Sequence, residues 1–194
     1  MNCYSTPTGE SKVRRLHITV AILISVLIFS NMALIFFFSS ESGEVSGNRS
    51  EGITHTVIDI TCPDYDELPP AEQESILASV HHLIRKTAHF LEFALLGFLS
   101  ACLLLHLRRR LIPRILPWHT WILPAVFGLI YAASDEIHQI FSGRGPRVTD
   151  VLIDGAGVLC GIAVSHAVVW LIRSITTHTT KQGRRTSTHE NDTL

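Results

Sequence analysis

The chain has 194 residues, 46% of them hydrophobic and only 17% charged, and its length suits a single domain. Long apolar runs alternate with short polar ones, which argues against an ordinary soluble globule. Sixteen Lys and Arg against seventeen Asp and Glu give a formal net charge of −1, so there is no bulk electrostatic basis for binding nucleic acid. We therefore expect a membrane protein without a nucleic-acid partner.

Four apolar runs are long enough to cross a membrane. They lie at residues 18–38, 88–107, 118–141 and 148–172. About twenty residues at 1.5 Å each span the roughly 30 Å hydrocarbon layer, and backbone groups in lipid must be paired within the segment, which favours helices. The first run is longer than the roughly 7–15 apolar residues of a cleaved signal peptide, so we expect it to remain as an anchor. The predicted fold is all-α, an integral membrane four-helix bundle.

Basic residues predict the orientation of the bundle. The N-terminus, the loop after the second run and the C-terminal tail are basic, whereas the segment after the first run is acidic. Because short basic loops stay in the cytoplasm, we expect a multi-pass protein of the cell membrane with both termini cytoplasmic. The predicted parts are a cytoplasmic N-terminus (1–16), the first transmembrane helix (17–38), an extracytoplasmic loop (39–85), a core of three transmembrane helices (86–173) and a disordered cytoplasmic tail (174–194).

The extracytoplasmic loop is too long to be a plain connector. After Pro69 and Pro70, the acidic Glu72 and Glu74 begin a helix signature in which apolar residues recur on one face. This pattern predicts an additional amphipathic helix over about 70–85. Such a helix would lie along the outer membrane surface before the chain turns inward, or it would pack on the neighbouring helices.

Ionisable residues gather near the outer ends of the last three runs. In the second run, Lys86, His89 and Glu92 stand at i, i+3 and i+6, within about a third of the helix circumference. Charges in lipid are costly, so this convergence predicts a polar pocket open to the outer surface, while the inner half is expected to lack polar residues. The predicted ligand-binding residues are Lys86, His89, Glu92, Asp135, Glu136, His138, Gln139, Arg144, Arg147, Asp150 and Asp154.

The third run ends with four of these residues. Asp135, His138 and Gln139 share one helix face, and Glu136 is turned about 100° away from it. Ion pairs and hydrogen bonds of this kind can also serve only to hold transmembrane helices together, so a purely structural role is the alternative for the group.

The fourth run begins with Asp150 and Asp154 at i, i+4, and Gly157 and Gly161 continue the same stripe. A stripe of small residues predicts close packing against a neighbouring helix.

No recognised metal or cofactor motif accompanies the polar residues. Imidazole and carboxylate groups are suitable metal ligands, but no HExxH, CxxC, P-loop, GxSxG or dinucleotide motif occurs. We therefore expect neither a metal nor a cofactor. Lys86, Arg144 and Arg147 fit an anionic group better, because a planar guanidinium matches phosphate or carboxylate.

Two sequence blocks resemble the VanZ-like membrane proteins. They are RKTAHFLEFALLG (85–97) and SDEIHQIFSGRGPRVTDVLIDGAGVLCG (134–161). The family pattern is K-x-x-H-F, then D-E-x-H-Q-x-F, a short Gly/Pro loop with Arg, and D-x-x-x-N-x-x-G-x-x-x-G. At Asp154 this chain departs from it, since the family commonly has Asn there. The resemblance implies a multi-pass membrane protein whose namesake is associated with low-level resistance to teicoplanin, and it brings no established catalytic mechanism.

The leading functional prediction is a binding protein, not an enzyme, with membrane lipids as its partners. The expected ligand is an envelope lipid, a lipid-linked cell-wall precursor or a lipoglycopeptide. In this hypothesis the cations hold an anionic group, and the carboxylates, His138 and Gln139 line the pocket wall.

Two other classes of function stay open. The first is an integral-membrane hydrolase or transferase acting on a lipid head group, with Glu136 or Asp135 as general base and His138 or His89 as general acid. The second is a transporter, which is disfavoured because an apolar inner half offers no continuous polar path.

Overall fold

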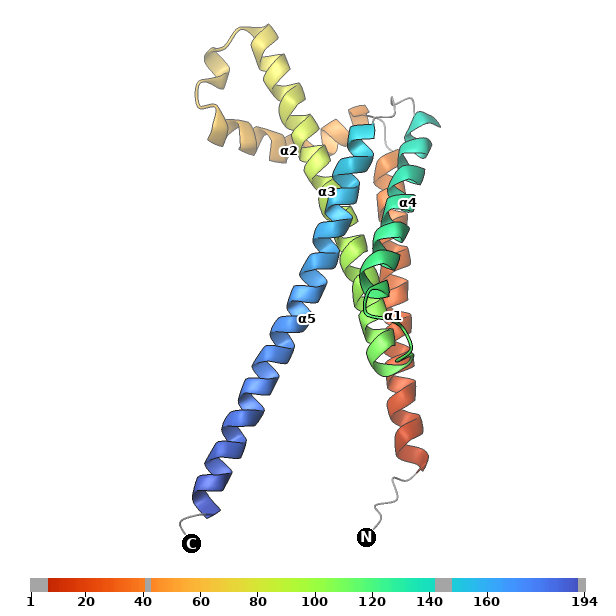
Figure 1. The fold of residues 1–194 in the computed structure, drawn as a ribbon. Helices are drawn as coiled ribbons and strands as arrows, with labels where there is room; N and C mark the ends of the chain where they lie inside the picture. The colour runs from red at the N-terminus through yellow and green to blue at the C-terminus, as the bar shows by residue number, and fades with distance from the viewer. Residues whose placement is uncertain (1–6, 41–42, 142–147, 192–194) are drawn as a thin grey trace.

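The protein is all-helical. The computed structural model describes residues 7–40, 43–141 and 148–191, and no strand occurs among them, which confirms the all-α part of the predicted fold (Figure 1). Besides a short 3-10 helix at Tyr65–Glu67, the elements are α1 (Pro7–Ser40), α2 (Gly43–Thr61), α3 (Pro70–Arg110), α4 (His119–Phe141) and α5 (Val148–Asn191).

α3 is the central helix. It contacts α1, α2, α4 and α5, and α4 packs in addition against α1 and α5. Figure 1 shows both chain termini at one end of the molecule and the connection between α2 and α3 at the opposite end. We call these the terminal end and the distal end. The last turns of α1 and α4 and the first turns of α5 therefore meet α3 at the distal end.

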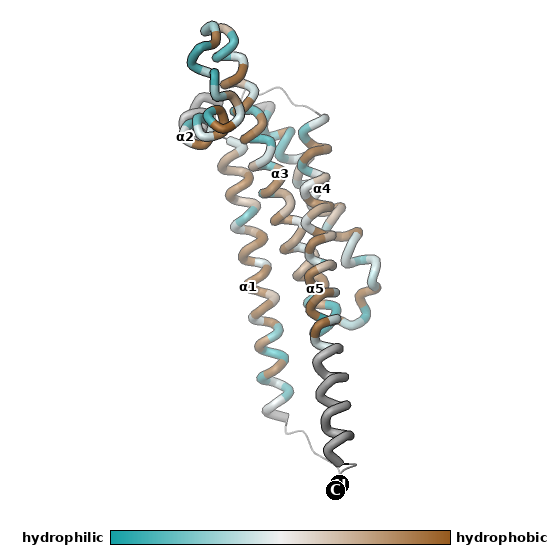
Figure 2. The backbone as a smooth tube through the Cα atoms, turned by 90° about the vertical axis from the view of Figure 1, so that its left-hand side faces the viewer, coloured by the Kyte–Doolittle hydropathy of each residue, from teal (hydrophilic) through white to brown (hydrophobic). Residues whose placement is uncertain are grey.

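Three helices are long and apolar enough to cross a membrane. They are α1 over Gly9–Ser40, α3 over Pro70–Arg110 and α5 over Thr149–Thr177. Large apolar side chains cover their outer surfaces; Phe29 is 69% exposed and Trp170 is 68% exposed. Figure 2 shows hydrophobic residues along most of the length of the bundle. An apolar surface of this extent fits lipid, and the protein is a membrane protein.

α4 packs among these helices but does not meet the same criterion. Polar residues at both of its ends, including His119 and Asp135, leave an apolar stretch over 121–133. At 1.5 Å per residue this stretch is roughly 20 Å long, which is shorter than the hydrocarbon layer of roughly 30 Å. Three spans are therefore supported by length and composition, and the fourth stays a prediction.

The predicted amphipathic helix over 70–85 is helical but is not a separate interfacial element. It begins at Pro70, as expected for proline in a first turn, and continues without a break into the second apolar run as α3. No Gly or Pro occurs between Ala71 and Leu96. Nothing in the sequence therefore ends the helix at Lys86. Extending a formed helix costs much less than starting a new one, so the helix continues into the apolar run.

α2 is a helix that the sequence analysis missed. It packs on α3, where Ile58 and Thr54 are fully buried and Thr54 Oγ1 lies 3.1 Å from His81 Nδ1. α2 is mostly polar, and only a few of its positions face α3, so its sequence shows no clear apolar pattern. The predicted extracytoplasmic loop is therefore largely a pair of helices.

α5 also extends further than predicted. The fourth apolar run ends near residue 172 and the polar residues after it predict a disordered tail, whereas the helix continues to Asn191. In the first turns beyond the apolar run, the hydroxyls of Thr176 and Thr177 donate to carbonyl groups three or four residues earlier. Propagation from an existing helix, which avoids the cost of nucleation, accounts for this extension.

Glycines allow α3 and α5 to cross with their backbones in contact. A Cβ atom on Gly161 would overlap the carbonyl group of Ala94, and one on Gly157 would overlap that of Phe90. On the other helix, a Cβ on Gly97 would overlap the α5 backbone. The packing role predicted for the glycine stripe of α5 is confirmed.

Gly161→Ala is expected to lower the free energy of unfolding by about 1–3 kcal/mol, because the added methyl group forces the two backbones apart. Thermal unfolding of the purified chain in detergent micelles measures this loss. Gly52→Ala on α2 is the matched control, since a Cβ there meets nothing within 4 Å and alanine favours the helix. Equal stability of the two variants would contradict the close crossing.

Candidate functional site

Four polar side chains are buried together at the distal end. Asp135, Glu136 and Gln139 come from α4 and Asp154 from α5, and none is more than 8% exposed. Buried polar groups in a membrane protein are costly unless they are paired or bind something. We call these four residues, with Lys86, His89 and Asp150, the distal polar cluster.

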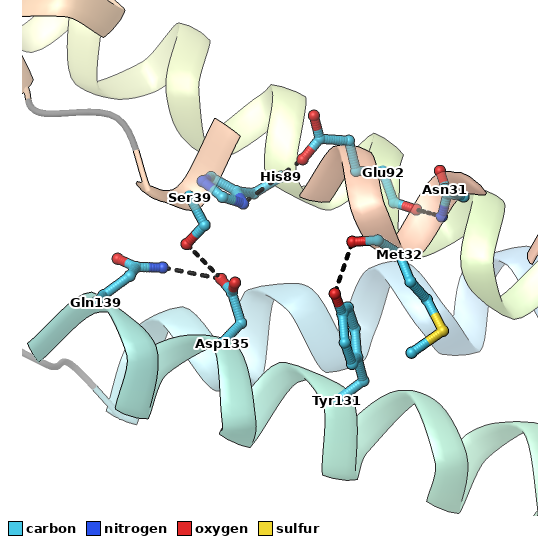
Figure 3. Close-up of polar contacts among 8 residues, drawn as sticks. All are labelled: Asn31, Met32, Ser39, His89, Glu92, Tyr131, Asp135 and Gln139. Atoms are coloured by element: carbon cyan, nitrogen blue, oxygen red, sulfur yellow. Dashed lines mark hydrogen bonds and ion pairs between the residues drawn. The ribbon is translucent and has the colours of Figure 1, made fainter. Parts of the chain in front are cut away.

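Asp135 links α4 to α1. Its Oδ2 atom accepts a hydrogen bond from Ser39 Oγ at 2.9 Å and another from Gln139 Nε2 at 2.9 Å (Figure 3). One turn earlier on α4, Tyr131 donates its hydroxyl to the backbone carbonyl of Met32 at 2.7 Å. These bonds hold the end of α4 against the end of α1.

Lys86 links α3 to α5. Its Nζ atom forms an ion pair with Asp150 Oδ2, and the two side chains are only 16% and 14% exposed. Removing one partner of such a pair leaves a largely buried charge uncompensated, which is strongly destabilising. The pair therefore joins two of the predicted site residues across the helix crossing.

His89, Asp135 and Asp154 converge from three different helices. One nitrogen of the imidazole and one oxygen of each carboxylate lie within 4.8 Å of one another. His89 Nδ1 is also 3.7 Å from Oε2 of Glu92, and the backbone carbonyl of Glu92 accepts a hydrogen bond from Asn31 Nδ2 at 3.1 Å (Figure 3).

A small cavity adjoins His89 and Asp154 but is not lined by Asp135. Its volume is about 20 Å³, which suits about one water molecule. The cavity is nearly closed, whereas the sequence predicts a pocket open to the outer surface, and ligand binding there stays a prediction. The lining residues are Arg85, Lys86, His89, Glu136, Gln139, Asp150 and Asp154.

One prediction about α4 needs correction. Glu136, although turned about 100° from the face of Asp135 and Gln139, is 5% exposed and lines the cavity, because α4 packs against α1, α3 and α5. His138, also expected in the pocket, instead faces α1. Its Nε2 atom is 2.9 Å from Ser40 Oγ, and its ring stacks on Phe36 with the ring centroids 4.3 Å apart. The predicted site residues Arg144 and Arg147 lie outside the described residues.

Residues 21–172 match the sequence model of the VanZ/LLP1 family. The chain belongs to the VanZ/LLP1 family. The matched region includes every residue of the distal polar cluster. Comparisons with curated proteins and with solved structures find no match.

Three residues of the site in this VanZ/LLP1 protein escaped the sequence analysis. Ser39, Ser40 and Arg85 are the missed positions. Both serines follow an uninterrupted apolar run, at the same predicted depth as the acids of α4. That shared depth was the available signal, but hydroxyl groups are too common at helix ends to mark a site by themselves.

The expectation that the other half of the bundle lacks polar residues is wrong. Toward the terminal end, His166 Nε2 lies 3.1 Å from Thr120 Oγ1, and its ring stacks on Trp121 with the centroids 3.9 Å apart. His106 Nε2 lies 3.0 Å from the backbone carbonyl of His17. Isolated histidines within apolar runs give no periodic signal, so only the packing shows that they meet partners.

An apolar groove of about 320 Å³ lies between α1, α3 and α4. Phe29, Leu103 and Phe127 contribute to its lining. Ser100 also lines it, and its Oγ atom is buried with no hydrogen-bond partner among the described residues. The groove is nearer to the terminal end than the distal polar cluster: Phe127 precedes Asp135 by roughly 12 Å along the axis of α4, at 1.5 Å per residue.

Ser39→Ala is expected to lower the free energy of unfolding by about 1–3 kcal/mol, because it removes a donor from a buried carboxylate. Chemical or thermal unfolding in micelles measures the change. Ser40→Ala, one residue later and exposed, should stay within about 0.5 kcal/mol of the unaltered chain. A larger loss for Ser40→Ala than for Ser39→Ala would contradict the importance of the Ser39–Asp135 bond.

Proposed function

We propose that this VanZ/LLP1 protein binds the polar head group of an envelope lipid, a lipid-linked cell-wall precursor or a lipoglycopeptide at the distal polar cluster. The observation that carries the proposal is the burial of Asp135, Glu136, Gln139 and Asp154 at one end of an apolar membrane bundle. Fewer polar groups would suffice to hold four helices together, and ionisable residues within membrane segments commonly mark ligand sites.

Lys86 is the cation best placed to receive an anionic head group. In the ligand-free state its charge is balanced by Asp150. A phosphate or carboxylate can replace Asp150 as the partner, and the released Asp150 is then available to accept hydrogen bonds from sugar or amine groups. Arg85 lines the same cavity, and Arg144 and Arg147 follow α4 in the sequence.

The small size of the cavity determines how binding proceeds. A volume of about 20 Å³ admits about one water molecule, so a head group enters only when the Lys86–Asp150 pair opens. Binding is therefore coupled to a rearrangement of the Lys86 and Asp150 side chains, while the glycine crossing holds α3 and α5 in place. A ligand stabilises the open arrangement by the difference between its affinities for the two states.

The apolar groove supports a ligand that carries a hydrocarbon chain. Its volume of about 320 Å³ and its lining by α1, α3 and α4 suit part of an acyl or prenyl chain. A lipid with its head group at the distal polar cluster has its chain directed into the hydrocarbon layer, toward the depth of this groove.

We further propose that the distal end faces the outside of the cell and that both termini are cytoplasmic. Single-cysteine proteins that retain only Cys62 or only Cys3 test this. Cys62 lies between α2 and α3 and is partly exposed, so a membrane-impermeant maleimide should label it in intact cells and label Cys3 only after lysis. The reverse labelling pattern would overturn the proposed orientation.

Head-group binding is tested with the purified chain by native mass spectrometry. The probes are phosphatidylglycerol, undecaprenyl phosphate and teicoplanin, each compared with phosphatidylcholine. At least one anionic probe should bind in preference, and Lys86→Gln should weaken that binding about 10–100-fold, since a charge-assisted hydrogen bond contributes about 1.5–3 kcal/mol.

Arg109→Gln is the matched control for this experiment. It removes a cation from the same helix at its other end, where the side chain is exposed, and should leave binding unchanged. Equal binding by Lys86→Gln and the unaltered chain, or no preference for any probe over phosphatidylcholine, refutes the proposal. Release of a product from a bound lipid would favour the hydrolase or transferase alternative.

A contribution to glycopeptide resistance is a further part of this proposal, supported by the VanZ/LLP1 family membership. Expression in a teicoplanin-susceptible bacterium should raise the inhibitory concentration of teicoplanin. Lys86→Gln should remove the increase, whereas Arg109→Gln should keep it at equal membrane abundance. An increase that survives Lys86→Gln would separate resistance from the distal polar cluster.

A further inference from the structure

We propose that His89, Asp135 and Asp154 bind one divalent transition-metal cation, Zn²⁺ or Mn²⁺. The three residues come from α3, α4 and α5, and one ligand atom of each lies within 4.8 Å of the other two. Residues close in sequence on one helix are often near each other in space by chance. Residues from three helices are brought together only by the tertiary fold.

The spacing is close to that of a bound ion. Ligand atoms about 2.0–2.2 Å from a tetrahedral metal lie about 3.3–3.6 Å apart. Side chains whose ligand atoms lie within 4.8 Å of one another reach this spacing if each moves by roughly an ångström or less.

Asp154 provides an independent reason to expect a cation. Its side chain is only 3% exposed and lines the cavity. Within the described part of the chain it forms no hydrogen bond and no ion pair; the charge of Lys86 attracts it, but Lys86 is itself paired with Asp150. A buried carboxylate without a hydrogen bond or ion pair of its own is costly. A cation in the adjacent cavity offsets that cost, and a volume of about 20 Å³ suits one ion or one water molecule.

The other two ligands are arranged for the same ion. Asp135 uses Oδ2 for its hydrogen bonds to Ser39 and Gln139, which orients the carboxylate and leaves Oδ1 for a metal. His89 Nδ1 lies 3.7 Å from the carboxylate of Glu92, beyond hydrogen-bond distance. Metal-binding histidines commonly direct their second ring nitrogen toward a carboxylate, and closing this gap would give His89 that contact.

The ligand types select the metal. One imidazole with two carboxylates suits Zn²⁺ or Mn²⁺, whereas Mg²⁺ and Ca²⁺ prefer oxygen ligands alone. The two carboxylates balance the charge of a divalent ion. Three protein ligands leave a coordination position for solvent or for an oxygen of a bound molecule. The inference requires only these three side chains and does not depend on the proposed head-group binding.

The test uses the full-length chain, purified in detergent without a polyhistidine tag and stripped with EDTA. Isothermal titration with ZnCl₂ and with MnCl₂ in the absence of added lipid should show one high-affinity site per chain for at least one metal. His89→Gln and Asp154→Asn should each weaken that site at least tenfold. The same metal should raise the Tm of the unaltered chain and not that of either variant, because only a ligand that binds the folded state stabilises it.

His166→Gln is the control for loss of a histidine. It alters α5 toward the terminal end, where the imidazole contacts Thr120 and Trp121, and it should keep the high-affinity site. The absence of a stoichiometric site for both metals, or equal affinity in the unaltered chain and in a folded Asp154→Asn protein, overturns the inference. Because no lipid is present, this result is independent of the outcome for head-group binding.

Discussion

The contact between the backbones of α3 and α5 is the constraint on which the rest of the structure depends. Gly157 and Gly161 rest on the carbonyl groups of Phe90 and Ala94, so neither helix can slide or rotate without a collision. Helices fixed at this distance and register place Asp154, three residues before Gly157, beside His89. The geometry of the distal polar cluster is thus set by residues that have no side chain.

The same end of the bundle shows three ways of accommodating a carboxylate away from water. Asp150 pairs with a lysine, and Asp135 accepts hydrogen bonds from a serine and a glutamine. Asp154 has neither kind of partner among the described residues and adjoins the cavity. The first two arrangements are self-sufficient and stabilise the fold. The third leaves a carboxylate beside the cavity that can attract a cation or a polar ligand.

Prediction from the sequence succeeded where a pattern extends along a single segment of the chain. The apolar runs predicted the helices of α1, α3, α4 and α5, and the glycine stripe predicted close packing. Prediction failed where contacts with a neighbouring helix determine the structure. α2 is hidden by its polar composition because only positions such as Thr54 and Ile58 meet α3. His138 was expected in the pocket, whereas the neighbouring α1 supplies its partners, Phe36 and Ser40.

Sequence alone determined that this is an α-helical membrane protein and that its ionisable residues lie at similar depths, because helix length and the cost of charge in lipid are properties of each segment. Only the tertiary structure decided which of those residues meet. His89, Asp135 and Asp154 converge, whereas His138 faces Phe36 and Ser40. Depth along a helix is readable from residue spacing, but rotation about the helix axis is set by the packing of its neighbours.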